Sequence, residues 1–158
     1  MVDEDADWKA WSKGLVANVP EIIAGVLLVV ISVVVFLEVI YRYIIQAPLP
    51  WTQEVAIFAF VWYCLLCAAV GVKYRLHFAL EFLVSRLPKQ LQRAIRVLVV
   101  LSTSGVLVVL VWAGMAIVVL NSGQRSPILD MPMSIPYLSV PVSATLMLLY
   151  LWRDLVRE

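Results

Sequence analysis

The sequence has little charge and few of the residues that build soluble active sites. Of its 158 residues only 15% are charged, whereas 63% are hydrophobic and the mean hydropathy is +0.96. Soluble domains contain about 25% charged and roughly 45–50% apolar residues, so the shortage of charge excludes a soluble enzyme. Six glycines and eight prolines are too few for a fibrous chain, and the apolar content excludes a disordered one. The composition therefore predicts an integral membrane protein.

An excess of charge of one sign is also missing. Twelve Lys and Arg against eleven Asp and Glu give a net charge of +1, so we expect no nucleic-acid partner. The single histidine, His77, has no Cys and carboxylate set at zinc spacing around it, and we predict no metal site. The sequence shows no Ser/His/Asp arrangement, nucleotide motif or phosphate-binding glycine loop. We therefore predict no catalytic residue and no cofactor held by this chain.

Four apolar runs are long enough to cross a bilayer, which takes about 20 helical residues for ~30 Å of hydrocarbon. They are apolar on every face, whereas barrel strands alternate apolar and polar residues. We predict an all-α integral membrane protein with four transmembrane helices plus amphipathic interfacial helices. The last helix either begins or is kinked near Pro136 or Pro141. The predicted organisation is an N-terminal amphipathic segment (1–20) and a four-helix membrane domain (21–158), with spans at about 22–45, 54–72, 97–121 and 135–153 and an amphipathic loop at 73–96.

Basic residues alternate between the two ends of the predicted spans. Only Arg42 and Arg125 fall on one side, and the other ten fall on the opposite side. By the positive-inside rule, both termini and the 73–96 loop are expected to be cytoplasmic. The ten are Lys9, Lys13, Lys73, Arg75, Arg86, Lys89, Arg93, Arg96, Arg153 and Arg157.

Two amphipathic segments are predicted to lie at the cytoplasmic membrane surface. The first places two tryptophans and Leu15 on one helical face, and the second is the 73–96 loop. Basic residues near anionic headgroups contribute about 1 kcal/mol each, so we expect contact with anionic lipids. A frayed tail is the alternative for the first segment, and a specific partner surface for the second. The predicted interfacial residues are Trp8, Trp11, Lys73, Arg75, His77, Arg86, Lys89, Arg93 and Arg96.

Ionisable residues at membrane depth are costly and are therefore candidates for function. Glu38 and Arg42 are spaced for an intrahelical ion pair, and Glu54 begins the second span. We predict that they share one polar network with Tyr43 and Trp51 that orients two helices or a partner helix. Proton or ion coupling through Glu38 is the alternative.

Two further motifs have competing interpretations. Cys64 and Cys67 form a CxxC motif inside an uncharged helix, where thiols behave as small hydrophobic groups. The turn after the third span is rich in proline, and it either docks another protein or simply closes a helical hairpin. The candidate docking residues are Arg125, Pro127, Met131 and Pro132.

Several motifs together resemble the DctQ-like small membrane subunit of tripartite ATP-independent periplasmic (TRAP) transporters. The resemblance extends from Ile22 to Trp152 and departs from the family where Gln53, rather than a second acid, precedes Glu54, and where Glu81 stands in place of an aspartate. Its motifs are Tyr41-Arg42-Tyr43, Pro50-Trp51-Thr52-Gln53-Glu54, Ala68-Ala69-Val70-Gly71-Val72 followed by Lys73 and Arg75, His77, and the stretch from Met131-Pro132 to Pro141.

The resemblance implies a scaffold subunit that does not itself carry substrate. In this family a larger membrane subunit moves an organic acid, such as a C4-dicarboxylate or sialic acid, by a sodium-driven elevator motion, and a periplasmic binding protein delivers it. Sodium is then expected in the partner subunit, and the chain in the inner membrane of a bacterium or archaeon. The alternatives from other classes are a small proton-coupled multidrug antiporter using Glu38 and a membrane thiol oxidoreductase using Cys64 and Cys67.

Overall fold

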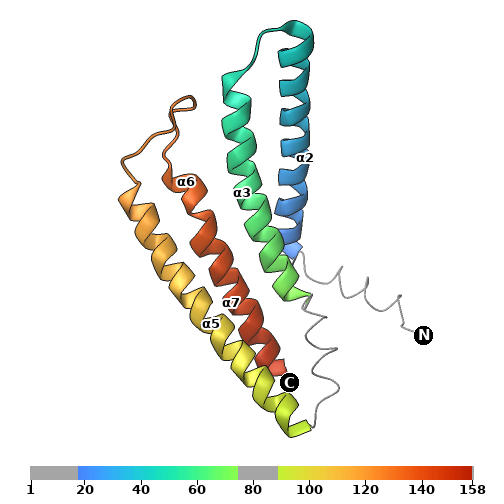
Figure 1. The fold of residues 1–158 in the computed structure, drawn as a ribbon, viewed down its shortest axis with the longest axis vertical. Helices are drawn as coiled ribbons and strands as arrows, with labels where there is room; N and C mark the ends of the chain where they lie inside the picture. Colours follow the sequence, from blue (N-terminus) through green and yellow to red (C-terminus); the bar gives the residue numbers. More distant parts are fainter. Residues whose placement is uncertain (1–17, 75–88, 158) are drawn as a thin grey trace, which may run out of the picture.

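A computed structural model describes residues 18–74 and 89–157 of the chain. This part is helical apart from its connecting turns, which confirms the predicted all-α class. The predicted surface residues Trp8, Trp11, Arg75, His77 and Arg86 lie outside the described residues. The elements are α2 (Val19–Ile40), η2 (Tyr41–Ile45), α3 (Pro50–Lys73), α5 (Lys89–Leu120), α6 (Ser134–Tyr137) and α7 (Ser139–Arg157), as Figure 1 shows.

Four helices are long and apolar enough to cross a membrane, as predicted: Val19–Ile45, Pro50–Lys73, Val97–Leu120 and Ser134–Arg153. The first two begin earlier than the sequence predicts because a proline occupies the first turn of each helix. Proline is favoured there, since the first helical N–H groups have no intrahelical acceptor in any case.

The last span contains both prolines that the sequence left as possible starting points. Pro136 lies within α6, the helix is interrupted at Leu138, and Pro141 lies in the first turn of α7. The span therefore begins at Ser134, before both prolines, and is broken between them. Proline cannot donate to the preceding turn, which explains the break.

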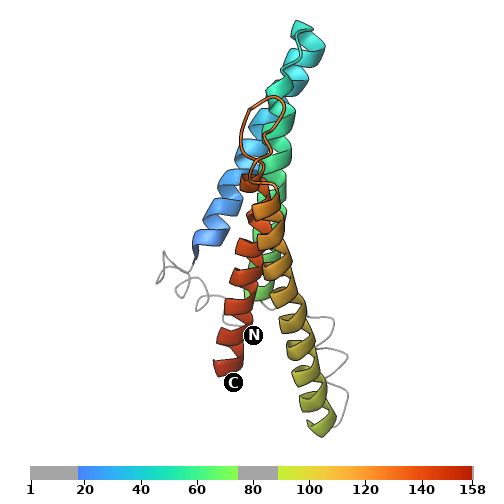
Figure 2. The ribbon, with the colours of Figure 1, turned by 90° about the vertical axis from the view of Figure 1, so that its left-hand side faces the viewer.

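The four long helices form an open row in the order α2, α3, α7, α5 (Figure 1). In the described part of the chain α2 packs mainly on α3, α3 on α7, and α7 on α5. Figure 2 shows this row from its α5 edge, where the helices cross one another at modest angles. Consequently α3 and α7 are inner helices, and α2 and α5 form the two edges.

Small residues allow the helices to approach closely. Ala24 of α2 and Ala59 and Ala69 of α3 are buried. Gly114 of α5 lies so close to α7 that an added Cβ would come within 2.9 Å of Pro141 Cδ. Close packing of this kind replaces the hydrophobic driving force, which is absent between helices surrounded by lipid.

Each helix of the row has its two ends at opposite faces of the layer, and we name these the Glu54 end and the Lys73 end after the α3 residues found there. At the Glu54 end lie η2, the turn that follows it and residues 121–133, and at the Lys73 end lies the start of α2. The π-helix η2 ends at Gln46, whose φ of 57° is left-handed, and Ala47 N donates to Tyr41 O at 3.0 Å. In Figure 1 this tip of the α2–α3 hairpin extends beyond the turn between α5 and α6.

Candidate functional site

Residue Glu54, near the start of α3, binds a loop that lies far away in the sequence. Its carboxylate accepts hydrogen bonds from the Ser126 hydroxyl, from Leu129 N at 3.0 Å and from Ile128 N at 3.3 Å. Bonds to an ionised acceptor are about twice as strong as bonds between neutral groups. We call this set the Glu54 contact. It fixes the 121–133 loop against the end of α3.

The loop itself is a small, well-defined hairpin. Ser126 N donates to Met131 O and Met133 N donates to Gln124 O, both at 2.9 Å. Arg125 forms an exposed ion pair with Asp130, also at 2.9 Å. The four candidate docking residues, Arg125, Pro127, Met131 and Pro132, all lie exposed on this hairpin. The loop is therefore preformed and accessible to a partner.

The Glu38 and Arg42 side chains are paired on the same helix, with Arg42 Nη2 2.8 Å from Glu38 Oε1. The carboxylate is 18% exposed and the guanidinium side chain 51%. The described hydrogen bonds of Glu54 go to the loop and not to Arg42, so these acids divide between two clusters instead of the one predicted network. The reason is that Arg42 already has a carboxylate one turn away, whereas the loop offers Glu54 three donors.

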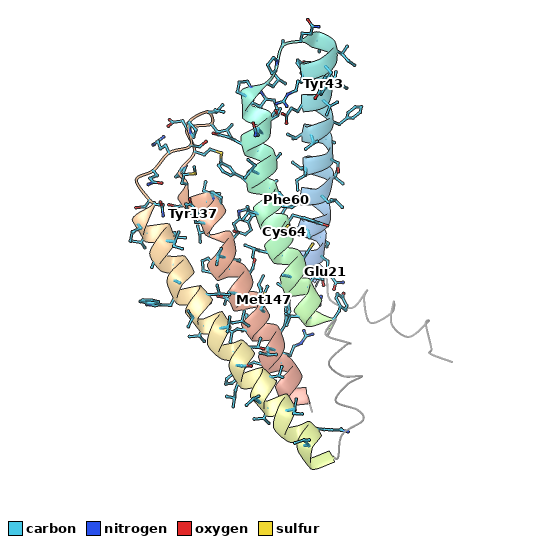
Figure 3. The ribbon with its side chains drawn as sticks, viewed as in Figure 1. Glu21, Tyr43, Phe60, Cys64, Tyr137 and Met147 are labelled. Atoms are coloured by element: carbon cyan, nitrogen blue, oxygen red, sulfur yellow. The ribbon has the colours of Figure 1, made fainter. Side chains whose placement is uncertain are left out.

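The remaining members of the predicted network, Tyr43 and Trp51, are exposed at the tip of the α2–α3 hairpin. Figure 3 shows Tyr43 at the Glu54 end of α2, opposite Glu21. Neither side chain has a described hydrogen bond that joins the two acid clusters.

A second contact joins α3 to the broken helix. Trp62 Nε1 of α3 donates to Ile135 O of α6 at 3.2 Å, and Ser139 Oγ donates to Pro136 O at 2.5 Å. Prolines at membrane depth are tolerated because neighbouring groups satisfy the freed backbone oxygens. The two prolines are evident in the sequence, but the role of Trp62 as a donor is not. Nothing in the sequence indicates which helix supplies the hydrogen-bond donor to the broken helix.

The third contact lies at the Lys73 end. Lys73 Nζ is paired with the Glu21 carboxylate of α2 and also donates to Asn18 Oδ1 at 3.3 Å. It lies 5.3 Å from the centroid of the Tyr74 ring and 6.0 Å from that of the Tyr150 ring of α7. This contact therefore joins α2, α3 and α7.

The position of Lys73 differs from the predicted one at the lipid surface. Its side chain is 8% exposed and that of Glu21 is 12% exposed. Glu21 is not among the predicted site residues, because a single acid near the start of an apolar helix gives no sign of a partner 52 positions later. Among the other predicted surface residues, Lys89, Arg93 and Arg96 fall in the first turns of α5.

Within residues 18–74 and 89–157 no group of three His, Cys, Asp or Glu side chains is placed to hold a metal ion. Cys64 and Cys67 are both free thiols on α3. The arrangement can join helices through polar contacts at three depths, and it displays a rigid loop.

Comparison with known families decides what kind of protein this is. The family model for the DctQ component of tripartite ATP-independent periplasmic transporters matches residues 31–158. The chain belongs to the DctQ family. The match confirms the resemblance seen in the motifs, and a search of curated proteins finds no match.

As a DctQ component, the chain is a multi-pass membrane protein and one part of a three-part transporter, with two further components implied. This family is not enzymatic, so the thiol oxidoreductase alternative for Cys64 and Cys67 is wrong, and an independent multidrug antiporter is not supported. Glu54, Trp62 and Lys73 all fall inside the matched residues, whereas Glu21 precedes them.

Proposed function

We propose that this DctQ component is a static scaffold that braces the large membrane subunit of its transporter. The observation that carries the proposal is that α3 is joined to its neighbours at both ends and in the middle, by the Glu54, Trp62 and Lys73 contacts. A subunit whose helices moved against one another during transport would have to break these bonds in each cycle. Hydrogen bonds that form in one arrangement of the helices stabilise that arrangement.

The distribution of polar groups supports the same proposal. Lys73 follows Glu54 by 19 residues, which is about 28 Å of helix and close to the ~30 Å thickness of the hydrocarbon layer. The buried polar residues of the described chain are the hydroxyl residues Thr52, Ser126, Ser139 and Ser143, and the largely buried charges of Glu21 and Lys73 are paired with each other. These four hydroxyl groups are too few to line a path for a charged organic acid, because charged solutes at membrane depth need charged or strongly polar partners.

In this proposal the large subunit carries the substrate by a sodium-driven elevator motion, and the sodium ions bind there. The substrate is an organic acid such as a C4-dicarboxylate or sialic acid, delivered by a binding protein that contacts the 121–133 loop. Both termini and the 73–96 segment lie on the cytoplasmic side of the inner membrane, where the basic residues of this segment contact anionic lipids.

Reconstitution tests the proposal directly. The chain, its large subunit and the binding protein are purified and placed in liposomes with an inward sodium gradient, and uptake of radiolabelled succinate and sialic acid is measured. We expect uptake only with all three components. Uptake by this chain alone, or undiminished uptake without it, would show that it is not a scaffold.

A further inference from the structure

The guanidinium of Arg42 is incompletely bonded within the described chain. It carries five N–H donors, and its described hydrogen bond uses one of them, to Glu38 Oε1 at 2.8 Å. About half of the side chain is exposed. Some of its donors are therefore open to a further acceptor.

The direction of the Arg42 side chain is unfavourable for contact with lipid headgroups. Side chains on a helix lean towards its N-terminus, and the bond to Glu38 holds Arg42 back along α2, towards the end where Glu21 lies. Glu38 follows Glu21 by 17 residues, or about 26 Å. Because Glu21 is paired with Lys73 at one boundary of the membrane span, Glu38 lies just inside the other boundary. The backbone of Arg42 lies about 32 Å from Glu21, but its guanidinium is held back at the depth of Glu38.

An exposed guanidinium in hydrocarbon is costly, and the usual relief is for the side chain to extend to the headgroups. The bond to Glu38 opposes that movement. The exposed donors therefore need a protein acceptor at the same depth. This acceptor must approach from outside the chain, because α2 is an edge helix whose described packing is mainly on α3.

The face of α2 beside Arg42 is open from Leu28 to Arg42. The residues of this face are spaced alternately four and three positions apart, so they lie on one side of the helix. All of them are exposed. This docking face consists of Leu28, Ser32, Val35, Val39 and Arg42. The α3-facing side of α2, marked by buried Val34, is the adjacent one, and buried Ala24 ends the docking face one turn before Leu28.

The opposite edge of the row has a different character. Between residues 97 and 120, α5 has no charged side chain, and its exposed residues include Leu98, Leu101, Val109 and Trp112. Such a surface is suited to lipid. Charge at membrane depth thus marks the α2 edge as the protein-facing side of the row.

We propose that the docking face of α2 binds a transmembrane helix of the large membrane subunit, and that this helix presents a carboxylate or carbonyl oxygen to Arg42. The inference rests on the proposed function, because it assumes that the large subunit is the partner. Beyond that function, it names the face of α2 that contacts the large subunit and the acceptor group that the partner helix must present to Arg42.

Photo-crosslinking in the assembled complex tests the choice of face. A benzophenone amino acid replaces Val35 on the docking face or Val109 on α5, in the full chain co-expressed with its large subunit. We expect an adduct with the large subunit from position 35 at a yield several-fold above that from position 109. The proposal is overturned by an adduct from position 109 alone, by an adduct of two copies of this chain, or by lipid adducts alone at position 35 while the subunits still co-purify.

Substitution tests the role of the charge. We expect Arg42→Met to lower recovery of the large subunit about tenfold, as for loss of a bond to a charged group, and Arg42→Lys to lower it less. Wild-type recovery with Arg42→Met overturns the proposal. If Arg42→Met does not fold alone, Val35→Trp on the same face is compared with Val109→Trp, and equal recovery of the two overturns it. A wild-type chain that never co-purifies with the large subunit instead contradicts the scaffold function itself.

Discussion

Residue Glu54 accepts a hydrogen bond from the hydroxyl of Ser126, 72 positions later in the chain. This bond and the two amide bonds beside it attach the 121–133 loop to α3 near the start of that helix. In Figure 1 the tip of the α2–α3 hairpin extends further than this loop of the α5–α7 hairpin. One carboxylate thus connects the two hairpins at the Glu54 end.

Replacing Glu54 tests this connection. Glu54→Gln keeps the shape but removes the charge, and bonds to a charged group contribute about 1.5–3 kcal/mol. We expect faster amide hydrogen exchange at Ile128 and Leu129, with the four long helices retained. Gln53→Ala is the matched control, because Gln53 is exposed and lies next to Glu54 in α3. Unchanged exchange in Glu54→Gln would mean that the loop is held by its own hairpin bonds.

The close approach of α5 and α7 is tested at Gly114. A Cβ there would come within 2.9 Å of Pro141 Cδ and 3.2 Å of Val140 Cγ1. We expect Gly114→Val to lower the free energy of unfolding in detergent by about 1–3 kcal/mol, the usual effect of overpacking. Gly105→Val is the control, since nothing lies within 4 Å of its added Cβ. Equal thermal stability of the two variants would contradict the packing described for this helix pair.

The ion pair between Glu21 and Lys73 is largely buried, so each single substitution removes a charged partner at a site with little access to water. Breaking a buried pair costs about 3–5 kcal/mol. We expect Glu21→Met and Lys73→Met each to be strongly destabilised and the double variant to be less destabilised than the sum of the two. Unfolding in increasing dodecyl sulfate measures this double-mutant cycle. Strict additivity would show that the two charges act independently.

The indole of Trp62 is tested by removing its donor while keeping an aromatic ring. Trp62→Phe loses the bond to Ile135 O, and we expect a loss of about 1 kcal/mol in unfolding free energy. Trp112→Phe is the control because Trp112 is exposed on α5. If both variants unfold alike, the contact at the helix break contributes nothing to stability.

The sequence predicts the four spans and the local Glu38–Arg42 pair because both depend on neighbouring residues: long apolar runs and a spacing of four along one helix. It could not predict the partners of Glu54 or Lys73. Helices that are apolar all round carry no periodic signal of which neighbour each face meets. The order of the row, and hence which distant groups come together, is set by close packing of small residues such as Gly114.

The open row also bears on how this protein is made. Each hairpin, α2 with α3 and α5 with α7, has its own helix contacts, and no central helix must be enclosed by the others. Two hairpins of this kind can leave the insertion machinery one after the other, as in a two-stage scheme in which spans form before they associate. Packing of α7 on α3 is then the final step of biogenesis. It is completed when Ser126 and Ile135 of the second hairpin form their hydrogen bonds with α3, which is already in the bilayer.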